Sequence, residues 1–356
     1  MRAIVWTGEL EVRDDVEVRP PGLREVAVRI HRAGLCHSDV SVIDGTIPMP
    51  PPIVLGHEGA GIVEEVGAAV TGVTPGDHVV LVTLGHCGQC DACDRGLPTH
   101  CRRPFGWSDT RFTTGGRQVP AFANLGVFSE RTVVHEHQAV VIDPAVPLDA
   151  ASLIGCAVVT GAGAVLNRAK VRPGETVAVI GAGGIGQSVI QGARLASAGR
   201  IVAIDANPLK EAVARQFGAT DFIDASQHPE GTVAAAKELV PAGFDYAFEC
   251  VGHPALVRQA IDMLGTGGSC VLLGVPKLGT EASFVVGNLY NDKSILGCRY
   301  GQTRPHHDVP LITRFYLDGR FMLDEMVSQT YDLGDIERAL ADLEAGKLNR
   351  GVLTLT

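Results

Sequence analysis

A glycine-rich turn between two apolar runs constrains the fold of this chain more than any other feature. The first run, Thr176 to Ile180, leads into the turn GAGGIG at residues 181–186. A helical pattern follows, and a second run, Ile201 to Ile204, ends on Asp205. Strand, glycine turn, helix, strand and acid in this order are typical of a dinucleotide-binding βαβ unit. A glycine-rich turn in another kind of α/β domain is the alternative, which the two flanking strands disfavour.

The glycines of this turn have separate physical roles in holding a dinucleotide. Gly181 allows the tight turn, Gly183 lets the backbone approach a pyrophosphate, and Gly186 lets the helix pack closely on the strand. The helix N-terminus, at Gly184 and Ile185, offers free N–H groups and a positive dipole to the phosphates. All five residues are therefore expected cofactor contacts.

The acid at the end of the second run predicts which dinucleotide is bound. Asp205 can accept hydrogen bonds from both ribose hydroxyls and would repel a 2′-phosphate. The expected cofactor is therefore NAD(H) and not NADP(H). Lys210 can reach the adenosine ribose from the next helix, although a solvated helix lysine is an equally good interpretation.

Strand and helix patterns alternate through the second half of the chain and predict a doubly wound parallel sheet. Before this region, short alternating runs separated by Pro and Gly predict meandering β structure. The expected strands of the second half are 176–180, 201–205, 220–223, 244–249 and 269–273, and the expected helices are 185–197, 208–217, 231–240 and 254–264. After about residue 297 the alternation stops, and the tail is expected to return to the first domain.

Composition limits the classes of function. A length of 356 residues suggests two domains, and a net charge of −10 argues against binding to nucleic acid or to an anionic membrane. The sequence contains no apolar run long enough to span a membrane, and its N-terminus lacks the apolar core of a signal peptide. We therefore expect a cytoplasmic protein, in which nine cysteines suggest metal ligation or buried thiols before disulfides.

Four cysteines lie close together in a loop without periodicity, residues 84–125. Cys87, Cys90 and Cys93 are separated by two residues each, and Cys101 follows. Such spacing lets four thiolates converge on one tetrahedral ion, and a site of four cysteines is a closed, structural Zn²⁺ site. An iron–sulfur cluster fits less well because the gap before Cys101 is too long, and incidental thiols are the remaining alternative.

Three further candidate ligands are far apart in the sequence. Cys36 precedes a short helical stretch, His57 follows a proline-rich run, and Cys156 lies just before the second half. Each has an ordinary explanation, as a buried core thiol or a satisfied loop histidine. Spacing alone does not connect them.

Five motifs in order make the chain resemble the zinc-dependent medium-chain alcohol dehydrogenases along essentially its whole length. They are GLCHSD (34–39), GHEGAGIVEEVG (56–67), the four-cysteine loop (87–101), IGCAVVTGAGA (154–164) and VAVIGAGGIG (177–186). The resemblance implies an α/β fold, with a Rossmann sheet inserted into a β-rich, GroES-like catalytic domain. It implies a catalytic zinc domain at 1–157, an NAD-binding domain at 158–297 and a return to the catalytic domain at 298–356.

The resemblance also assigns a second zinc site, so that two zinc ions per chain are expected. Cys36, His57 and Cys156 would bind a catalytic Zn²⁺ with an open fourth position, the known arrangement of alcohol dehydrogenases. Glu58 would lie near this metal, and Asp39 would orient His57.

Other roles follow from the resemblance for residues around the two expected sites. Ser38 would accept the alcohol proton and pass it on through the ribose; because Ser41 stands where many relatives have histidine, water or His37 would end this relay. Thr83, Phe122 and residues 298–301 would line the substrate pocket. The remaining expected cofactor contacts are His37 and Arg350 at the pyrophosphate, Thr160 at the nicotinamide amide, and Val275.

The implied reaction is hydride transfer from a zinc-bound alcohol or alcoholate to NAD, with aldehyde or ketone reduction in reverse. A formaldehyde–thiol adduct, a polyol or a cyclic imine is an alternative substrate for the same machinery. A zinc-stabilised nucleotide-binding module without turnover is a third hypothesis, which the intact ligand set disfavours. A homodimer or homotetramer is expected, and the substrate is a small alcohol or aldehyde.

Overall fold

The computed structural model describes residues 1–104 and 110–355, so residues 105–109 of the expected loop 84–125 and the last residue lie outside it. The chain forms two compact units. Unit 1 contains residues 1–156 and the segment that begins at Arg304, and unit 2 contains Ala157–Thr303. Residues 298–303 therefore group with unit 2, where the hydroxyl of Thr303 donates a hydrogen bond to the carbonyl of Val159 at 3.1 Å.

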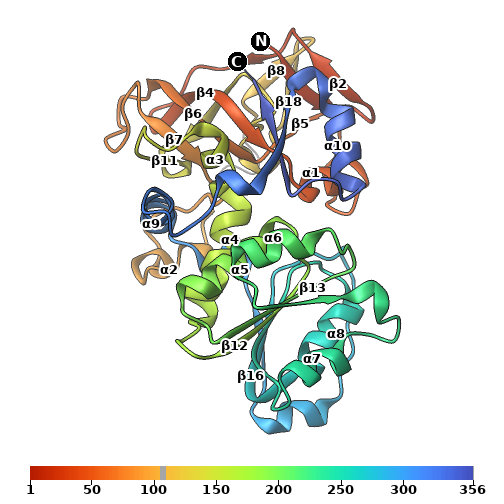
Figure 1. Cartoon of the computed structure of the whole chain (residues 1–356). Coiled ribbons are helices and arrows are strands. Elements are labelled where there is room, and N and C mark those ends of the chain that lie inside the picture. The colour runs from red at the N-terminus through yellow and green to blue at the C-terminus, as the bar shows by residue number, and fades with distance from the viewer. Residues whose placement is uncertain (105–109, 356) are drawn as a thin grey trace. The chain divides into compact units, whose positions relative to one another are not determined.

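Unit 2 contains a six-stranded parallel sheet in the order β14-β13-β12-β15-β16-β17 (Figure 1). The strands are β12 Thr176–Ile180, β13 Arg200–Asp205, β14 Asp221–Asp224, β15 Phe244–Glu249, β16 Leu264–Leu272 and β17 Ser294–Gly297. The helices are α4 Val159–Gly163, α5 Gly184–Leu195, α6 Lys210–Phe217, α7 Val233–Leu239 and α8 Pro254–Asp262. The strand order runs outward from β12 in both directions, which confirms the predicted doubly wound α/β fold. In such sheets the crevice at the carboxyl ends of the central strands binds ligands.

The central strands β12 and β13 are buried on both faces, which explains their continuous apolar runs. In β12, four successive residues from Val177 to Ile180 are at most 2% exposed. The core that they form with neighbouring strands and helices also includes Val202, Phe244, Ala247 and Ile261.

Unit 1 is built around a seven-stranded sheet with the path β11-β7-β6-β4-β19-β18, in which β10 also pairs with β4 (Figure 1). Its strands are β4 Glu25–Gly34, β6 Glu58–Val66, β7 His78–Leu81, β10 Arg131–His135, β11 Ala139–Val141, β18 Val327–Asp332 and β19 Arg350–Thr354. Two three-stranded sheets contain β1 Ala3–Trp6, β2 Leu10–Arg13 and β5 Ile53–Val54, and β3 Glu17–Val18, β8 Phe112–Thr114 and β9 Arg117–Val119. The helices are α1 His37–Ile43, α2 Asp91–Asp94, α3 Leu148–Ser152, α9 Pro305–Leu317 and α10 Ile336–Glu344.

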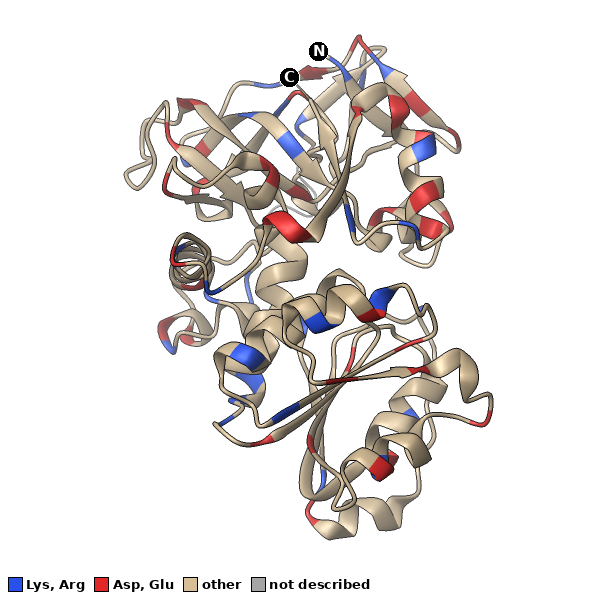
Figure 2. Ribbon diagram, viewed as in Figure 1, with Lys and Arg blue, Asp and Glu red and all other residues tan. Residues whose placement is uncertain are grey.

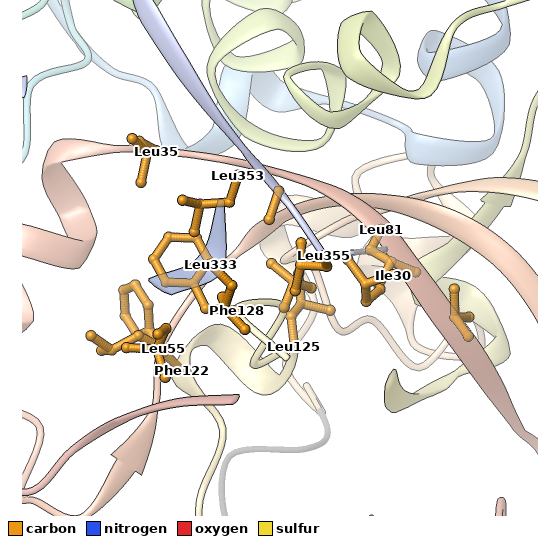
Figure 3. Close-up of a cluster of buried hydrophobic side chains, with 14 of the residues drawn as sticks. Ile30, Leu35, Leu55, Leu81, Phe122, Leu125, Phe128, Leu333, Leu353 and Leu355 are labelled. Atoms are coloured by element: carbon orange, nitrogen blue, oxygen red, sulfur yellow. The ribbon is translucent and has the colours of Figure 1, made fainter. Parts of the chain in front are cut away.

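The core of unit 1 lies against this sheet and joins distant parts of the sequence (Figure 3). Phe122 and Phe128 pack with Leu55 from the first part of the chain and with Leu333 and Leu353 from the tail. At about 25 cal/mol per Å² of apolar surface, burial of one such side chain stabilises the fold by about 2 kcal/mol. This core holds rigid the strands that carry the candidate ligands.

The sequence did not predict β5, nor β8 and β9 in the loop 84–125, nor β17 and β18. β17 contains only the half-buried residues Ser294–Leu296 and the exposed Gly297, and β18, at the edge of its sheet, alternates only weakly. Acidic and basic residues are interspersed along the ribbon of both units (Figure 2). Within residues 1–104 and 110–355, every helix is too short or too polar to cross a membrane.

Candidate metal and cofactor sites

The register of three strands gathers one cluster of candidate ligands in unit 1. Gly34, at the end of β4, pairs with Glu58 on β6 and with Val352 on β19. Continuing both antiparallel ladders past Gly34 brings Cys36 towards Arg350, which begins β19, and towards the segment before β6 that carries His57. Residues that are hundreds of positions apart therefore meet at one end of the sheet.

Cys156 joins this cluster from the π-helical turn Ile154–Val158, which follows α3. Gly155 lies directly on β7, because a Cβ atom there would be 2.0 Å from the carbonyl oxygen of Leu81. The ligand atoms of Cys36, His57, Glu58 and Cys156 all lie within 4.8 Å of one another. The structure thus brings together the three predicted zinc ligands and the predicted neighbour Glu58.

His57 is held in one orientation by a buried carboxylate. Asp39, on α1, lies 3.2 Å from Nδ1 of His57 through its Oδ1 atom, which also accepts the N–H of Gly56 at 3.1 Å. The other ring nitrogen, Nε2, is buried and has no hydrogen-bond partner in the described part of the chain. The edge of the Phe122 ring packs on the imidazole at 5.1 Å. A buried, unpartnered Nε2 beside two thiols fits a metal ion with nitrogen and sulfur ligands.

The electrostatics of this cluster reflect its burial. A hydrogen bond from Cys156 lowers the pKa of Cys36 well below its usual value, with help from the neighbouring His57. Burial raises the pKa of Glu58 to about 7, although Arg350 opposes the shift. The Arg350 guanidinium donates a short hydrogen bond to Oε2 of Glu58, and both side chains are at most 5% exposed. The pairing with Glu58, at the start of β6, therefore holds the Arg350 side chain at the start of β19.

The four-cysteine loop forms a second cluster in unit 1, around α2. The Sγ atoms of Cys90 and Cys93 are 3.6 Å apart, those of Cys90 and Cys101 are 3.9 Å apart, and those of Cys101 and Cys87 are 3.6 Å apart. A tetrahedral Zn²⁺ with bonds of about 2.3 Å requires sulfur–sulfur distances of about 3.8 Å. A hydrogen bond from the backbone of Arg102 lowers the pKa of Cys90 to about 6, which favours the thiolate that binds metal. The four sulfurs therefore have the geometry of a closed zinc site.

The first turn of α1 follows Cys36 directly and carries two further predicted residues. His37 is exposed and Ser38 is half-buried. Both lie in unit 1, whereas the glycine-rich turn lies in unit 2.

The glycine-rich turn joins β12 to α5 in unit 2. Gly181 has φ +92°, and a Cβ atom there would be 2.6 Å from the side chain of Val251. A Cβ atom at Gly186 would be 1.8 Å from the carbonyl oxygen of Gly181, so the close packing of helix on turn requires glycine. A Cβ atom at Gly183 would meet nothing within 4 Å. This open space at the start of α5, where Gly184 and Ile185 begin the helix, fits a pyrophosphate.

The other predicted cofactor residues of unit 2 lie on four different segments. Asp205, at the end of β13, accepts the N–H of Ala182 at 2.7 Å and that of Asn207 at 2.8 Å. Lys210 is 9% exposed at the start of α6, and burial lowers its pKa although Asp205 opposes this. Thr160 is buried on α4, and Val275 is 64% exposed after β16.

Two buried polar residues of unit 2 were not singled out from the sequence. Gln187 donates a hydrogen bond from Nε2 to the carbonyl of Ala182 at 3.1 Å. Glu249 ends β15 and accepts the N–H groups of Val251 and Gly252 at 2.8–3.0 Å. A polar residue directly after the glycine motif, on the face that the helical pattern buries, is the signal that could have identified Gln187.

Comparisons with known proteins agree with this arrangement. Residues 22–144 match the alcohol dehydrogenase GroES-like domain, and residues 184–317 match the zinc-binding dehydrogenase family. The S-(hydroxymethyl)glutathione dehydrogenase of Komagataella pastoris is 36% identical over 368 residues, covering 99% of this chain and 97% of that protein. The alcohol dehydrogenase-like 6 protein of Arabidopsis thaliana is 37% identical, covering 99% of this chain and 94% of that protein.

Solved structures with the same fold cover both units. An alcohol dehydrogenase zinc-binding domain protein from Burkholderia ambifaria superposes with a TM-score of 0.94 at 36% identity, covering 100% of this chain and 98% of that one. Benzyl alcohol dehydrogenase from Acinetobacter calcoaceticus has a TM-score of 0.92 at 33% identity, covering 100% and 99%. This chain belongs to the zinc-dependent medium-chain alcohol dehydrogenase family and is a zinc-dependent dehydrogenase of the alcohol type.

Proposed function

We propose that the chain oxidises primary alcohols to aldehydes with NAD and reduces aldehydes or ketones in reverse. The observation that carries this proposal is the buried Nε2 atom of His57, which has no partner among the described residues and lies beside the thiols of Cys36 and Cys156. A site of two thiolates and one imidazole leaves a fourth position open for substrate.

The residues of the buried cluster have separate tasks in this reaction. Cys36, His57 and Cys156 would hold zinc, which when bound supplies a Lewis acid that eases loss of the alcohol proton. Asp39 holds Nδ1 of His57 and so keeps Nε2 directed at the metal position. The Phe122 ring shields the imidazole from water on one side.

Proton transfer is assigned to the first turn of α1. Ser38 would accept the alcohol proton at Oγ and pass it on through the cofactor ribose. Because Ser41 offers no base of suitable pKa, His37 or water would take the proton at the end of this path. Glu58 is paired with Arg350 and lies close to the proposed zinc ligands. We assign it no proton-transfer step.

NAD is the proposed cofactor because an acid ends β13. The open space at Gly183 accommodates the pyrophosphate, and the free lone pairs of the Asp205 carboxylate accept the ribose hydroxyls. The proposed contacts are Gly181, Gly183, Gly184, Ile185, Gly186, Asp205, Lys210, Thr160 and Val275 in unit 2, with His37 and Arg350 from unit 1.

The choice of cofactor is tested by replacing this acid. In Asp205→Ala the ratio of kcat/KM for NAD to that for NADP should fall at least about tenfold, because the repulsion of a 2′-phosphate is lost. Asp224→Ala, at the end of the neighbouring strand β14, is the matched control and should leave the ratio unchanged. An unchanged ratio in Asp205→Ala would contradict the ribose assignment.

The reaction is tested by NADH formation from a panel of primary alcohols with the zinc-replete protein. Because relatives are named S-(hydroxymethyl)glutathione dehydrogenase, the panel includes formaldehyde with glutathione. A polyol and a cyclic amine complete it. Turnover of aliphatic or aromatic alcohols supports the main proposal, and turnover of the glutathione adduct alone supports the second. No turnover of any substrate would overturn both and favour a binding module.

Two zinc ions per chain are proposed, one in each cluster. All nine cysteines are free thiols, which suits a reducing compartment such as the cytoplasm. Metal analysis of the purified protein should find about two zinc ions per chain, and one would mean that one cluster is misassigned. Cell fractionation checks the compartment.

A homodimer or homotetramer is proposed on the basis of three exposed apolar residues of unit 2. Leu278, Val286 and Tyr290 are 76–90% exposed, close in sequence to the edge strand β17. Exposed apolar side chains beside an open sheet edge favour association with a second copy. Val286→Lys with Tyr290→Lys should reduce the mass measured by light scattering, whereas Leu23→Lys, a 67% exposed residue of unit 1, should not. A monomeric wild type would overturn this proposal.

A further inference from the structure

Each of the two peptide groups that flank the Cα of Ala182, in the middle of the glycine-rich turn, is held by a side chain. The N–H of Ala182 donates to Oδ2 of Asp205 at 2.7 Å, and the carbonyl of Ala182 accepts from Nε2 of Gln187 at 3.1 Å. Ala182 and Gln187 are both 0% exposed, so water cannot replace either hydrogen bond. Asp205 therefore fixes the Gly181–Ala182 peptide group, and Gln187 fixes the Ala182–Gly183 peptide group, which carries the N–H of Gly183.

Helix geometry explains why Gln187 can reach the turn that precedes its own helix. α5 begins at Gly184, and the backbone N–H of Gln187 bonds to the carbonyl of Gly183 at 2.8 Å. Side chains of a helix tilt towards its N-terminus, so a side chain in the first turn points back at the residues before the helix. The amide of Gln187 is long enough to cover that distance, and an apolar residue of the same size would have no donor there.

Fixing these two peptide groups matters because glycine stands on either side of Ala182. Gly181 has positive φ and Gly183 faces open space, so the turn has glycine freedom both before and after Ala182. Without Gln187 the Ala182–Gly183 peptide group could rotate and redirect the N–H of Gly183, just before the start of α5. A turn that is ordered before binding loses less entropy when a dinucleotide binds.

We propose that Gln187 is a positioning residue for the cofactor, which braces the Ala182–Gly183 peptide group, next to the peptide group that Asp205 holds, and keeps the glycine-rich turn ready for a pyrophosphate. The inference rests on the proposed use of a dinucleotide by unit 2. It also assigns Asp205 a second task, since the same carboxylate that would meet the ribose holds the turn.

The chain offers a matched control on the same helix. Gln191 lies one turn further along α5 and is also 0% exposed. A buried glutamine that serves only the stability of α5 would behave alike at both positions. The two can be separated by Gln187→Met and Gln191→Met, which keep side-chain volume and remove the amide.

The experiment measures NADH binding by fluorescence titration of the zinc-replete protein without alcohol, followed by steady-state kinetics. In Gln187→Met the Kd for NADH and the KM for NAD should rise about five- to tenfold, the effect of one lost buried hydrogen bond, while kcat changes less than KM. Gln191→Met should bind NADH as the wild type does. Equal binding by Gln187→Met and wild type, or equal weakening in both variants, would overturn the inference.

Gln187→Glu provides a second measurement that does not depend on the methionine variant folding. Its carboxylate lacks a donor at pH 8, and its protonated form has one at pH 5.5, since burial raises a carboxyl pKa. The ratio of its Kd for NADH to that of wild type should therefore shrink as pH falls. Asp205, which holds the preceding peptide group, is present in both proteins and cancels in the ratio. A ratio that does not change with pH would overturn the brace, whereas a wild type that fails to bind NADH would overturn the proposed function instead.

Discussion

The two ligand clusters of unit 1 are built in opposite ways. Cys87, Cys90, Cys93 and Cys101 come from one loop, and their sulfurs converge at 3.6–3.9 Å around a short helix. The cluster of Cys36, His57 and Cys156 is assembled from separate elements by strand register and by a π-helical turn. We call the four-cysteine site the local cluster and the site of Cys36, His57 and Cys156 the distributed cluster. The local cluster can hold its own loop together once metal binds, whereas the distributed cluster depends on a sheet that is already folded.

The surroundings of the clusters differ in the same sense. The four-cysteine loop contains mainly half-buried thiols. The distributed cluster includes the buried Glu58, which is paired with Arg350, and His57, which is oriented by Asp39. Buried charges of this kind persist only where partners compensate them. We infer that the local cluster serves stability and the distributed cluster serves chemistry.

The largest effect should come from removing a ligand of the distributed cluster. In Cys156→Ala, kcat/KM for any alcohol substrate should fall by at least about 10³, because the Lewis acid is lost. Metal analysis should show about one zinc ion fewer per chain, with the melting temperature changed little. The comparison fails if the variant keeps wild-type activity or its full zinc content.

The next effect should come from the local cluster and should appear in stability. Cys101→Ala should lower the melting temperature by at least about 5 °C, because metal binding free energy is folding free energy of the loop. Activity at low temperature should remain within about tenfold of wild type. Cys270→Ala, a buried thiol outside both clusters, is the control for loss of a thiol. A greater loss of activity than of stability in Cys101→Ala would reverse the assignment of the two roles.

The same contrast explains how much of the fold was predictable. The strands 176–180 and 244–249 were predicted with the bounds they have. The first is a continuous apolar run that is buried on both sheet faces, and the second is rich in aromatic residues and mostly buried. β17 and β18 were missed because short edge strands carry little pattern of their own. β17 is placed by parallel pairing with β16, and β18 is placed by parallel pairing with β19, which comes later in the chain.

The candidate sites divide in the same way. The spacing of the four cysteines was sufficient to predict their cluster, which the sulfur distances match. Spacing could not connect Cys36 with His57 and Cys156, and only the family resemblance did so, because their meeting depends on the register of β4 and β6 and on the packing of the turn Ile154–Val158 on β7. The brace formed by Gln187 was not predicted, since a helical pattern does not say where a buried amide points.

A smaller effect should come from the residue that orients His57. In Asp39→Asn the zinc ion of the distributed cluster should be lost to a chelator about tenfold faster, because a neutral amide holds the imidazole less firmly than a carboxylate. Zinc in the four-cysteine cluster should leave at its wild-type rate, so the time course should separate into two phases. Asp91→Asn, beside the local cluster, is the control. Faster loss from both clusters would indicate a general loss of structure and break the comparison.

The smallest effect concerns pH and a pair of histidines, His135 and His137, the second of which contacts the four-cysteine loop through its Nδ1 atom, 3.0 Å from the carbonyl oxygen of His86. His135, at the end of β10, packs its ring 4.9 Å from that of His137, and its Nδ1 atom accepts the N–H of His137 at 3.2 Å. Burial lowers the pKa of His135 from 6.5 to about 4, so the folded protein keeps this imidazole neutral while the unfolded chain takes up a proton. The unfolded state then binds more protons between about pH 6.5 and 4, and stability should fall as pH falls through this window.

This pH effect is measured as the urea midpoint between pH 7.5 and 5, on zinc-replete protein. His135→Gln keeps a polar side chain that does not titrate, so its midpoint should fall less steeply with acid than that of wild type. His228→Gln, a histidine outside this cluster, should leave the slope unchanged. If the urea midpoints of wild type and His135→Gln fall equally steeply with acid, the imidazole of His135 titrates alike in the folded and the unfolded state. In that case this imidazole would contribute no pH-dependent stability to the part of unit 1 that contacts the four-cysteine loop.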